Sequence, residues 1–276
     1  MKTRKAELLV TAPSFLWLGI FVFVPFAIIV AISFKQALPA GGIGSGWSLD
    51  AWRSLRDPAY PGILLYTLFV SVVTTALCIV LALPVAWHLA RVSEKWRSLL
   101  LLLVIIPFWT NFVIRVFAWQ QVLHAEGAIA KLLRLAGVLG ETDRLLGNTT
   151  AIVIVSVYTY LPFAILPIYA AAEKFDFHLL DAARDLGARP FRAFRSVFLP
   201  GIRKGLVTAL LIVFVPMLGS FVIPDMVGGT DTRMIGNVIA QRNFNDRNLP
   251  QAAALSCALT LLVLAPIILR RKERDA

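Results

Sequence analysis

The sequence predicts an all-α, polytopic membrane protein with six transmembrane helices. Three observations lead to this prediction. Hydrophobic residues make up 58% of the 276 residues, and the mean hydropathy of +0.77 is typical of membrane proteins. Six separate apolar runs are long enough to cross a hydrocarbon core. Lysine and arginine gather in alternate connections between these runs, as the positive-inside rule requires.

The apolar runs set the expected helices. A helix of roughly 20 residues crosses a hydrocarbon core of about 30 Å. The first run follows a basic start and resembles a signal peptide, but it exceeds the roughly 7–15 apolar residues of such a segment, so we expect a retained span. The six runs cover residues 8–34, 62–89, 99–122, 150–172, 206–227 and 252–269.

The basic residues predict the orientation of the chain. With the N-terminus in the cytoplasm, the cytoplasmic segments hold 17 of the 27 lysines and arginines, and the three outer connections hold nine. Arg115 lies inside the third run. This bias favours both termini in the cytoplasm. It also accounts for the net charge of +11 without a nucleic-acid partner.

The three outer connections differ in character. Residues 35–61 contain the glycine-rich stretch GGIGSGWS, which lacks the spacing of a nucleotide fingerprint and is typical of a flexible connector. Residues 124–149 carry apolar side chains at helical spacing, which predicts an amphipathic helix. Residues 228–251 are polar with short apolar anchors. We expect these connections to meet a partner that delivers substrate.

The inner connection 173–204 is the most informative segment. It is highly charged between two apolar runs, so it must lie in water. Apolar residues at 179–186 predict a short helix that ends at Gly187, where a left-handed backbone is favourable. Pro190 can begin a second helix, with Phe191, Phe194 and Phe198 on one side, and Pro200 ends it. A bent helix pair of this kind suits the membrane surface and another protein.

This segment resembles the EAA loop of the membrane-spanning subunits of bacterial ABC importers, written E-A-A-x3-G-x9-I-x-L-P. The spacing agrees throughout, with aspartate in place of the glutamate and valine in place of the isoleucine. The resemblance implies the fold of a type I ABC importer transmembrane domain and a loop that docks on a cytoplasmic ATPase. It implies these coupling residues: Asp181, Ala182, Ala183, Gly187, Val197, Leu199 and Pro200.

Three stretches narrow the resemblance. Residues 107–123, 179–188 and 221–239 are similar to the spermidine/putrescine importer permeases. The resemblance implies a bacterial inner-membrane protein that forms half of a pathway in a heterodimer with a second, homologous permease. Its other partners would be an ATPase dimer, a periplasmic binding protein and the lipid bilayer. The expected organisation is a first helix and outer loop at 1–61, a transmembrane domain at 62–270 that contains the loop 173–204, and a tail at 271–276.

A charged aromatic stripe is the candidate substrate path. Phe108, Phe112, Arg115 and Trp119 recur at spacings that place them on one face of a continuous helix. Aromatic rings attract cationic amines, and a carboxylate adds to this attraction. Arg115 either pairs with Asp225, lines the path or extends to the outer interface. The candidate residues are Phe108, Trp109, Phe112, Arg115, Trp119, Tyr158, Tyr160, Phe221 and Asp225.

Other functions find less support in the sequence. It has no H-E-x-x-H motif and no G-x-x-x-x-G-K-[ST] motif, so we expect no enzymatic activity, and ATP would be bound by a partner subunit rather than as a cofactor of this chain. The three histidines have no ligand spacing for a metal. Cys78 and Cys257 lie in apolar runs, which favours core packing over a disulfide. The alternatives are an ABC permease for an amino acid derivative, opine, iron or anion, and an ion-gradient-driven transporter.

Overall fold

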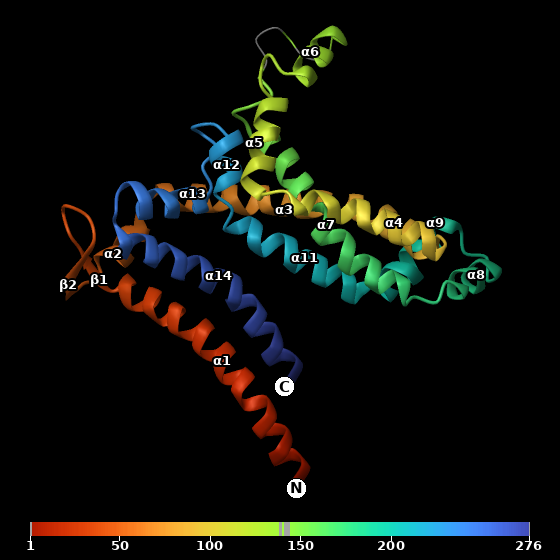
Figure 1. Cartoon of the computed structure of the whole chain (residues 1–276), viewed down its shortest axis with the longest axis horizontal. Coiled ribbons are helices and arrows are strands. Elements are labelled where there is room, and N and C mark those ends of the chain that lie inside the picture. The colour runs from red at the N-terminus through yellow and green to blue at the C-terminus, as the bar shows by residue number, and fades with distance from the viewer. Residues whose placement is uncertain (1, 138–139, 141–143, 276) are drawn as a thin grey trace. The chain divides into compact units, whose positions relative to one another are not determined.

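The structure, a computed structural model, describes residues 2–137, 140 and 144–275. It is built almost entirely of helices, which confirms the predicted all-α class (Figure 1). The chain divides into two compact units, one formed by Met1–Pro61 with Val238–Ala276 and the other by Gly62–Asn237.

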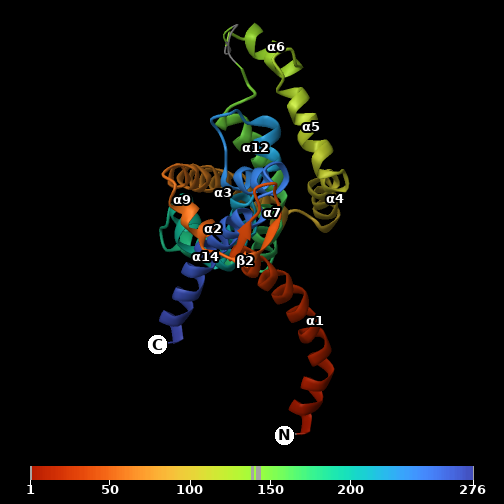
Figure 2. The ribbon, with the colours of Figure 1, turned by 90° about the vertical axis from the view of Figure 1, so that its left-hand side faces the viewer.

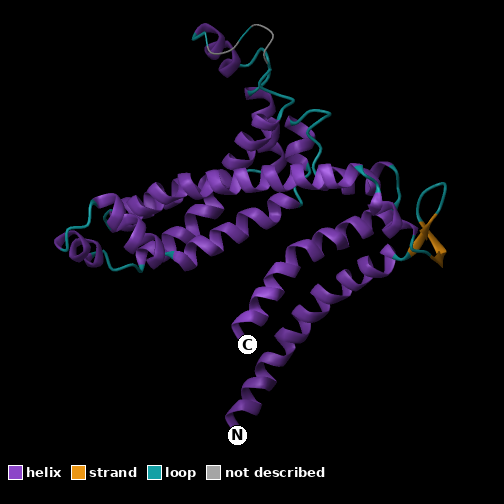
Figure 3. Ribbon diagram, turned by 180° about the vertical axis from the view of Figure 1, so that it is seen from behind, coloured by secondary structure: helices purple, strands orange, loops and turns teal. Residues whose placement is uncertain are grey.

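The first unit pairs the two ends of the chain. Helices α1 (Lys2–Ser33) and α14 (Leu249–Asp275) lie side by side (Figure 1). The predicted flexible connector is instead partly a β-hairpin, in which β1 (Lys35–Ala37) pairs antiparallel with β2 (Ile43–Trp47) (Figure 3). Gly41 has φ +89°, and a Cβ there would lie 2.7 Å from the Cβ of Arg247, so the turn requires glycine. The unit is completed by α2 (Asp50–Arg53), η1 (Ser54–Arg56) and η4 (Gln241–Asn245).

The second unit holds the remaining helices, and α13 continues from it into the first unit. They are α3 (Ala59–Arg91), α4 (Glu94–Ile105), η2 (Ile106–Trp109), α5 (Phe112–Val122), α6 (Ala128–Leu135), α7 (Thr149–Glu173), α8 (His178–Asp185), α9 (Pro190–Ala193), η3 (Phe194–Phe198), α10 (Leu199–Gly201), α11 (Arg203–Leu218), α12 (Val222–Val227) and α13 (Ile235–Ala240). Helix α6 is the amphipathic helix that the sequence predicts within residues 124–149.

Small residues allow the long helices of the second unit to approach closely. Helices α7 and α11 pack along each other, and a Cβ at Gly205 would lie 2.6 Å from both the Cβ of Ala171 and the carbonyl oxygen of Pro167. The buried face of α3 is likewise small, with Cys78, Ala82 and Ala86 all fully buried. Both cysteines are free and buried, as core packing predicts. Close backbone approach is the usual basis of helix packing in membranes.

Four of the six predicted runs correspond to single helices, namely α1, α3, α7 and α14. Within the described residues, three helices meet the length and apolarity of a membrane span, or five when each of two bent pairs is counted as one. The segment Leu249–Ala265 of α14 is a shorter apolar stretch.

The expectation of a continuous helix over 99–122 is wrong. The chain bends by 91° between Glu94–Trp109 and Phe112–Val122, and Figure 2 shows α5 leaving the end of α4 in a new direction. The Asn111 side chain accepts a hydrogen bond from the backbone N–H of Val113 at 2.8 Å, so it caps a new helix. Apolar composition continues across this break, and for that reason hydropathy did not reveal it.

The run 206–227 is also interrupted, between α11 and α12. The Asn237 amide donates to the carbonyl of Phe221 at 3.0 Å, and a Cβ at Gly236 would lie 2.4 Å from the carbonyl oxygen of Ser220. The segment after α12 therefore folds back against the break and satisfies part of its backbone.

Candidate functional site

The EAA loop (residues 173–204) has the bent helical form that its sequence predicts. Helix α8 ends at Asp185, Gly187 follows with φ +85°, and α9 begins at Pro190. Helix α10 ends at Gly201, and α11 begins at Arg203. The helical segments Pro190–Gly201 and Arg203–Leu218 meet at a bend of 72°. The predicted positive φ at Gly187 is confirmed. No atom lies within 4 Å of a Cβ built there, so only the backbone conformation requires glycine.

An aromatic cluster fixes the inner face of the loop to α3. The Trp87 ring makes edge contacts with the rings of Phe177, Phe194 and Phe198 at centroid distances of 5.4, 5.5 and 4.5 Å. Phe198 is fully buried. The ring centroids of Phe175 and Phe198 lie 5.2 Å apart. The Phe175 ring also packs on Gly201, because a Cβ at Gly201 would lie only 2.4 Å from Cε2 of Phe175. The loop is therefore packed directly against the end of α3.

The face of the loop that points away from the Trp87 cluster carries exposed apolar side chains. Leu179, Leu186 and Phe191 are 50%, 89% and 74% exposed. Phe191 thus departs from the prediction that it shares one side with Phe194 and Phe198. Phe191 lies in α9, whereas Phe194 and Phe198 lie in the π-helix that follows it, and Phe191 has no ring contact with the Trp87 cluster.

The motif residues divide between these two faces. Asp181, Ala182, Gly187 and Pro200 are exposed, and Asp181 forms a weak ion pair with Arg184 at 3.7 Å. The other three motif residues are partly buried against the core, and they are Ala183, Val197 and Leu199. Sequence reasoning missed Trp87, Phe175 and Phe177, because they lie outside the motif spacing. Their aromatic character close to the ends of apolar runs was the available signal.

The aromatic path residues form two groups rather than one stripe. Phe108 lies in η2, before the bend, so the predicted single helix face does not exist. The Arg115 guanidinium nevertheless lies over the Phe108 ring, with 4.9 Å from Cζ to the centroid, and Phe108 contacts Phe163 of α7 at 4.9 Å. Tyr160 lies 6.4 Å from Phe163 between ring centroids.

The second group is a single pair, Trp119 with Tyr158, at a centroid distance of 5.2 Å. Trp109 is 78% exposed, Phe112 packs partly against the core, and Phe221 and Asp225 are exposed on or beside α12. No nitrogen of Arg115 lies within 4.0 Å of a carboxylate oxygen of Asp225, so these two described residues form no ion pair. The Nε of Arg115 is buried without a hydrogen-bond partner.

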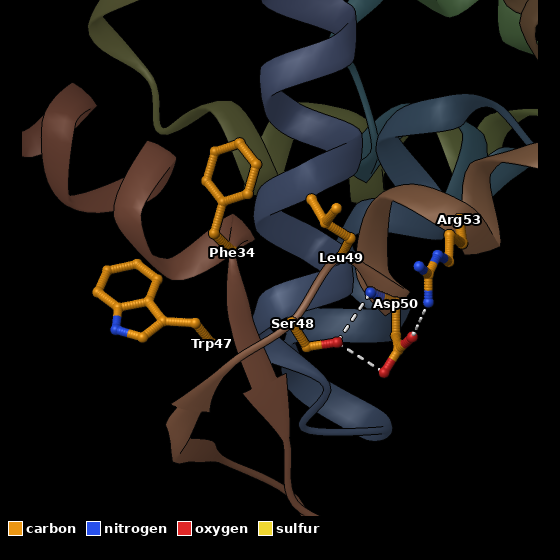
Figure 4. A pocket seen from close by; sticks show the side chains of 6 residues that line it. All are labelled: Phe34, Trp47, Ser48, Leu49, Asp50 and Arg53. Carbon is orange, nitrogen blue, oxygen red and sulfur yellow. Dashed lines mark hydrogen bonds and ion pairs between the residues drawn. The ribbon is translucent and has the colours of Figure 1, made fainter.

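A separate pocket lies in the first unit, beside the hairpin (Figure 4). It has a volume of about 590 Å³. Its Asp50 carboxylate already accepts from Ser48 at 2.6 Å and from Arg53 at 3.3 Å, which leaves little unpaired charge for a cationic ligand. The pocket is lined by Phe34, Trp47, Ser48, Leu49, Asp50 and Arg53. Among the described residues, no cluster of histidine, cysteine, aspartate and glutamate is suited to hold a metal ion.

Comparison with known proteins identifies relatives over most of the chain. Residues 79–275 match the family described as binding-protein-dependent transport system inner membrane component. The chain is 38% identical over 247 residues to the spermidine/putrescine transport system permease protein PotB of Salmonella typhimurium (strain SL1344), covering 90% of this chain and 86% of that protein. It is 35% identical over 260 residues to PotB of Haemophilus influenzae, covering 94% and 91%.

A solved structure has the same fold. A chain of a bacterial alginate ABC transporter, in complex with an alginate pentasaccharide-bound periplasmic protein, superposes with a TM-score of 0.67 over 97% of this chain and 94% of that chain. Its sequence identity of 17% means that the likeness concerns the fold alone.

Proposed function

Because the chain belongs to the family of binding-protein-dependent transport system inner membrane components, we propose that it forms half of the translocation pathway of an ABC importer for polyamines. The family consists of multi-pass permeases and not of enzymes. The observation that carries the proposal is the EAA loop, which is anchored to the helices on one face and exposed on the other.

The exposed face of the loop is suited to an ATPase partner. Leu186 and Phe191 extend outward on either side of the Gly187 bend. Arg184, Arg189 and Arg192 lie exposed around them, so the surface combines apolar anchors with a polar rim, as protein interfaces do. A dimeric ATPase would bind this surface and supply ATP, and the permease itself would need no cofactor.

Closure of the ATPase dimer would displace the loop as one body. The Trp87 cluster links the loop to α3, and the bend at Gly201 leads directly into α11. Displacement of the loop would therefore tilt these helices and change access to the pathway. In this mechanism the permease provides the pathway and the mechanical link from the loop to its helices, and ATP hydrolysis by the ATPase provides the free energy.

The relatives and the aromatic groups support a polyamine substrate. PotB proteins are named for spermidine and putrescine transport. In this chain the rings of Trp119 and Tyr158 offer cation-binding faces, the Phe108 ring has the Arg115 guanidinium over one of its faces, and the exposed Asp225 offers a carboxylate. These residues are our candidate substrate contacts.

The remaining partners and the orientation complete the proposal. A second, homologous permease would complete the pathway as a heterodimer, and a periplasmic binding protein would deliver the substrate, as in the alginate transporter of the same fold. The bias of basic residues supports cytoplasmic termini and a cytoplasmic EAA loop. We assign residues 1–61 to an N-terminal transmembrane helix and the first periplasmic loop, and residues 62–270 to the ABC transmembrane domain.

The position of Arg115 supports a second candidate function, that of an importer permease for an anionic or zwitterionic solute. Its guanidinium lies among the aromatic rings without a carboxylate partner among the described residues. A polycation would be repelled there, whereas an anion would be attracted.

Uptake by the purified transporter distinguishes the two candidates. The chain would be reconstituted in vesicles with its cognate permease, ATPase and binding protein, and uptake of labelled putrescine and spermidine would be measured with and without ATP. ATP-dependent polyamine uptake is the expected result. Uptake of an anion with none of either polyamine would overturn the proposed substrate.

A further inference from the structure

An ion pair connects the start of α4 to the end of α7. Nη1 of Arg97 lies 3.0 Å from Oε1 of Glu173, and the Tyr169 hydroxyl donates to the same oxygen at 2.7 Å. Glu173 is the last residue of α7, and the EAA loop begins there. The two charged side chains are 27% and 41% exposed, so the pair lies at the edge of the packed helices.

Helix α4 has few other attachments. None of its residues is buried, and Leu100, Leu101 and Val104 pack only partly against the core. In the described part of the chain, the Arg97–Glu173 pair is the one side-chain hydrogen bond or ion pair that joins α4 to another helix. This pair is therefore the polar contact that ties α4 to α7, beside the apolar packing of Leu100, Leu101 and Val104.

The far end of α4 leads into the candidate substrate path. Helix α4 continues through η2, where Phe108 lies, and past the bend to Arg115 of α5. Phe108 in turn contacts Phe163 of α7, and Arg115 lies over the Phe108 ring. A shift of α4 along α7 would thus change these aromatic contacts directly.

We propose that Arg97 is a positioning residue that transmits movement of the EAA loop to α4 and, through α4, to the aromatic path. Glu173 moves with the loop because Phe175 and Phe177 follow it into the Trp87 cluster. Arg97 follows the Glu173 carboxylate, whose orientation the Tyr169 hydroxyl holds. A helix without buried residues would otherwise lag behind the loop. The inference rests on the proposed function only in requiring an ATPase that moves the loop.

Charge reversal in the complete reconstituted transporter tests the proposal. The variants are Arg97→Glu, Glu173→Arg and their double exchange, with Lys95→Glu as a control for the same charge change two residues away on α4. Each single variant is expected to retain ATPase assembly and ATP hydrolysis while uptake per ATP falls roughly 5- to 10-fold. The double exchange is expected to restore most of the loss, and the control is expected to behave as wild type.

A second measurement does not depend on the substrate. Spin labels at Ile106→Cys and Val207→Cys, two exposed sites on η2 and α11, report the separation of these segments with and without ATP in the assembled complex. The separation is expected to change on ATP addition in wild type and in the double exchange, but not in Arg97→Glu. An unchanged response in Arg97→Glu, or a double exchange that restores nothing, would overturn the proposal. An intact label response without polyamine uptake would instead refute the proposed substrate alone.

Discussion

The ring of Trp87 lies edge-on against the ring of Phe198, with centroids 4.5 Å apart and planes at 80°. One ring belongs to the last turns of α3, and the other is the fully buried centre of the EAA loop. Because aromatic edge-to-face pairs in a packed core are energetically favourable, this contact holds the loop rigidly to a spanning helix. The loop can therefore act as a lever and not as a flexible connection.

The two faces of the loop should respond differently to truncation. Phe198→Ala removes a buried ring and should cost about 3–5 kcal/mol of stability, which thermal unfolding in detergent would detect. Phe191→Ala removes an exposed ring and should leave the unfolding temperature unchanged while weakening ATPase binding by roughly tenfold or more. Equal unfolding temperatures for the two variants would contradict the assignment of the faces.

Gly187 should tolerate only residues that accept a positive φ. The space around its Cβ is empty, so Gly187→Asn and Gly187→Val both fit, but valine strains the backbone at φ +85° by about 1–3 kcal/mol. Asparagine adopts this conformation more readily. We expect Gly187→Val to hydrolyse ATP with little uptake and Gly187→Asn to transport. Full coupling in the valine variant would show that the bend does not matter.

Close packing of α7 and α11 predicts a contrast between two glycines. Gly205→Ala places a methyl group 2.6 Å from the Pro167 carbonyl oxygen and should destabilise the protein by about 1–3 kcal/mol. Gly219→Ala, where the nearest atom is 3.9 Å away, is the matched control and should unfold at the wild-type temperature. Unfolding of both variants at the same temperature would contradict the close packing of α7 against α11 at Gly205.

Arg115 and Asp225 should act independently because they form no ion pair. For a polyamine substrate, Asp225→Asn is expected to raise the KM for uptake, since it removes an attractive charge, and Arg115→Gln is expected to lower it. The effects of the two substitutions on the free energy of binding should add in the double variant. Strong non-additivity, measured by uptake kinetics at several polyamine concentrations, would reveal a direct pair.

The sequence predicts the parts of this protein that local chemistry determines. Gly187 and Pro190 mark the bend because their backbone preferences act within a few residues. The bend at Asn111 was not predictable from periodicity, because the residues on both sides are equally apolar. The Trp87 cluster and the Arg97–Glu173 pair depend on contacts between distant segments, which spacing along one helix does not encode.

The central claim is that the EAA loop couples this permease to an ATPase, and site-directed cross-linking tests it most directly. Leu186→Cys, in a variant without Cys78 and Cys257, would be reconstituted with the cognate transporter subunits and treated with a short thiol cross-linker. The account predicts a cross-link to the ATPase subunit whose yield changes with ATP, and labelling of the cysteine only from the cytoplasmic side. Labelling from the outer side, with no cross-link to the ATPase, would contradict it.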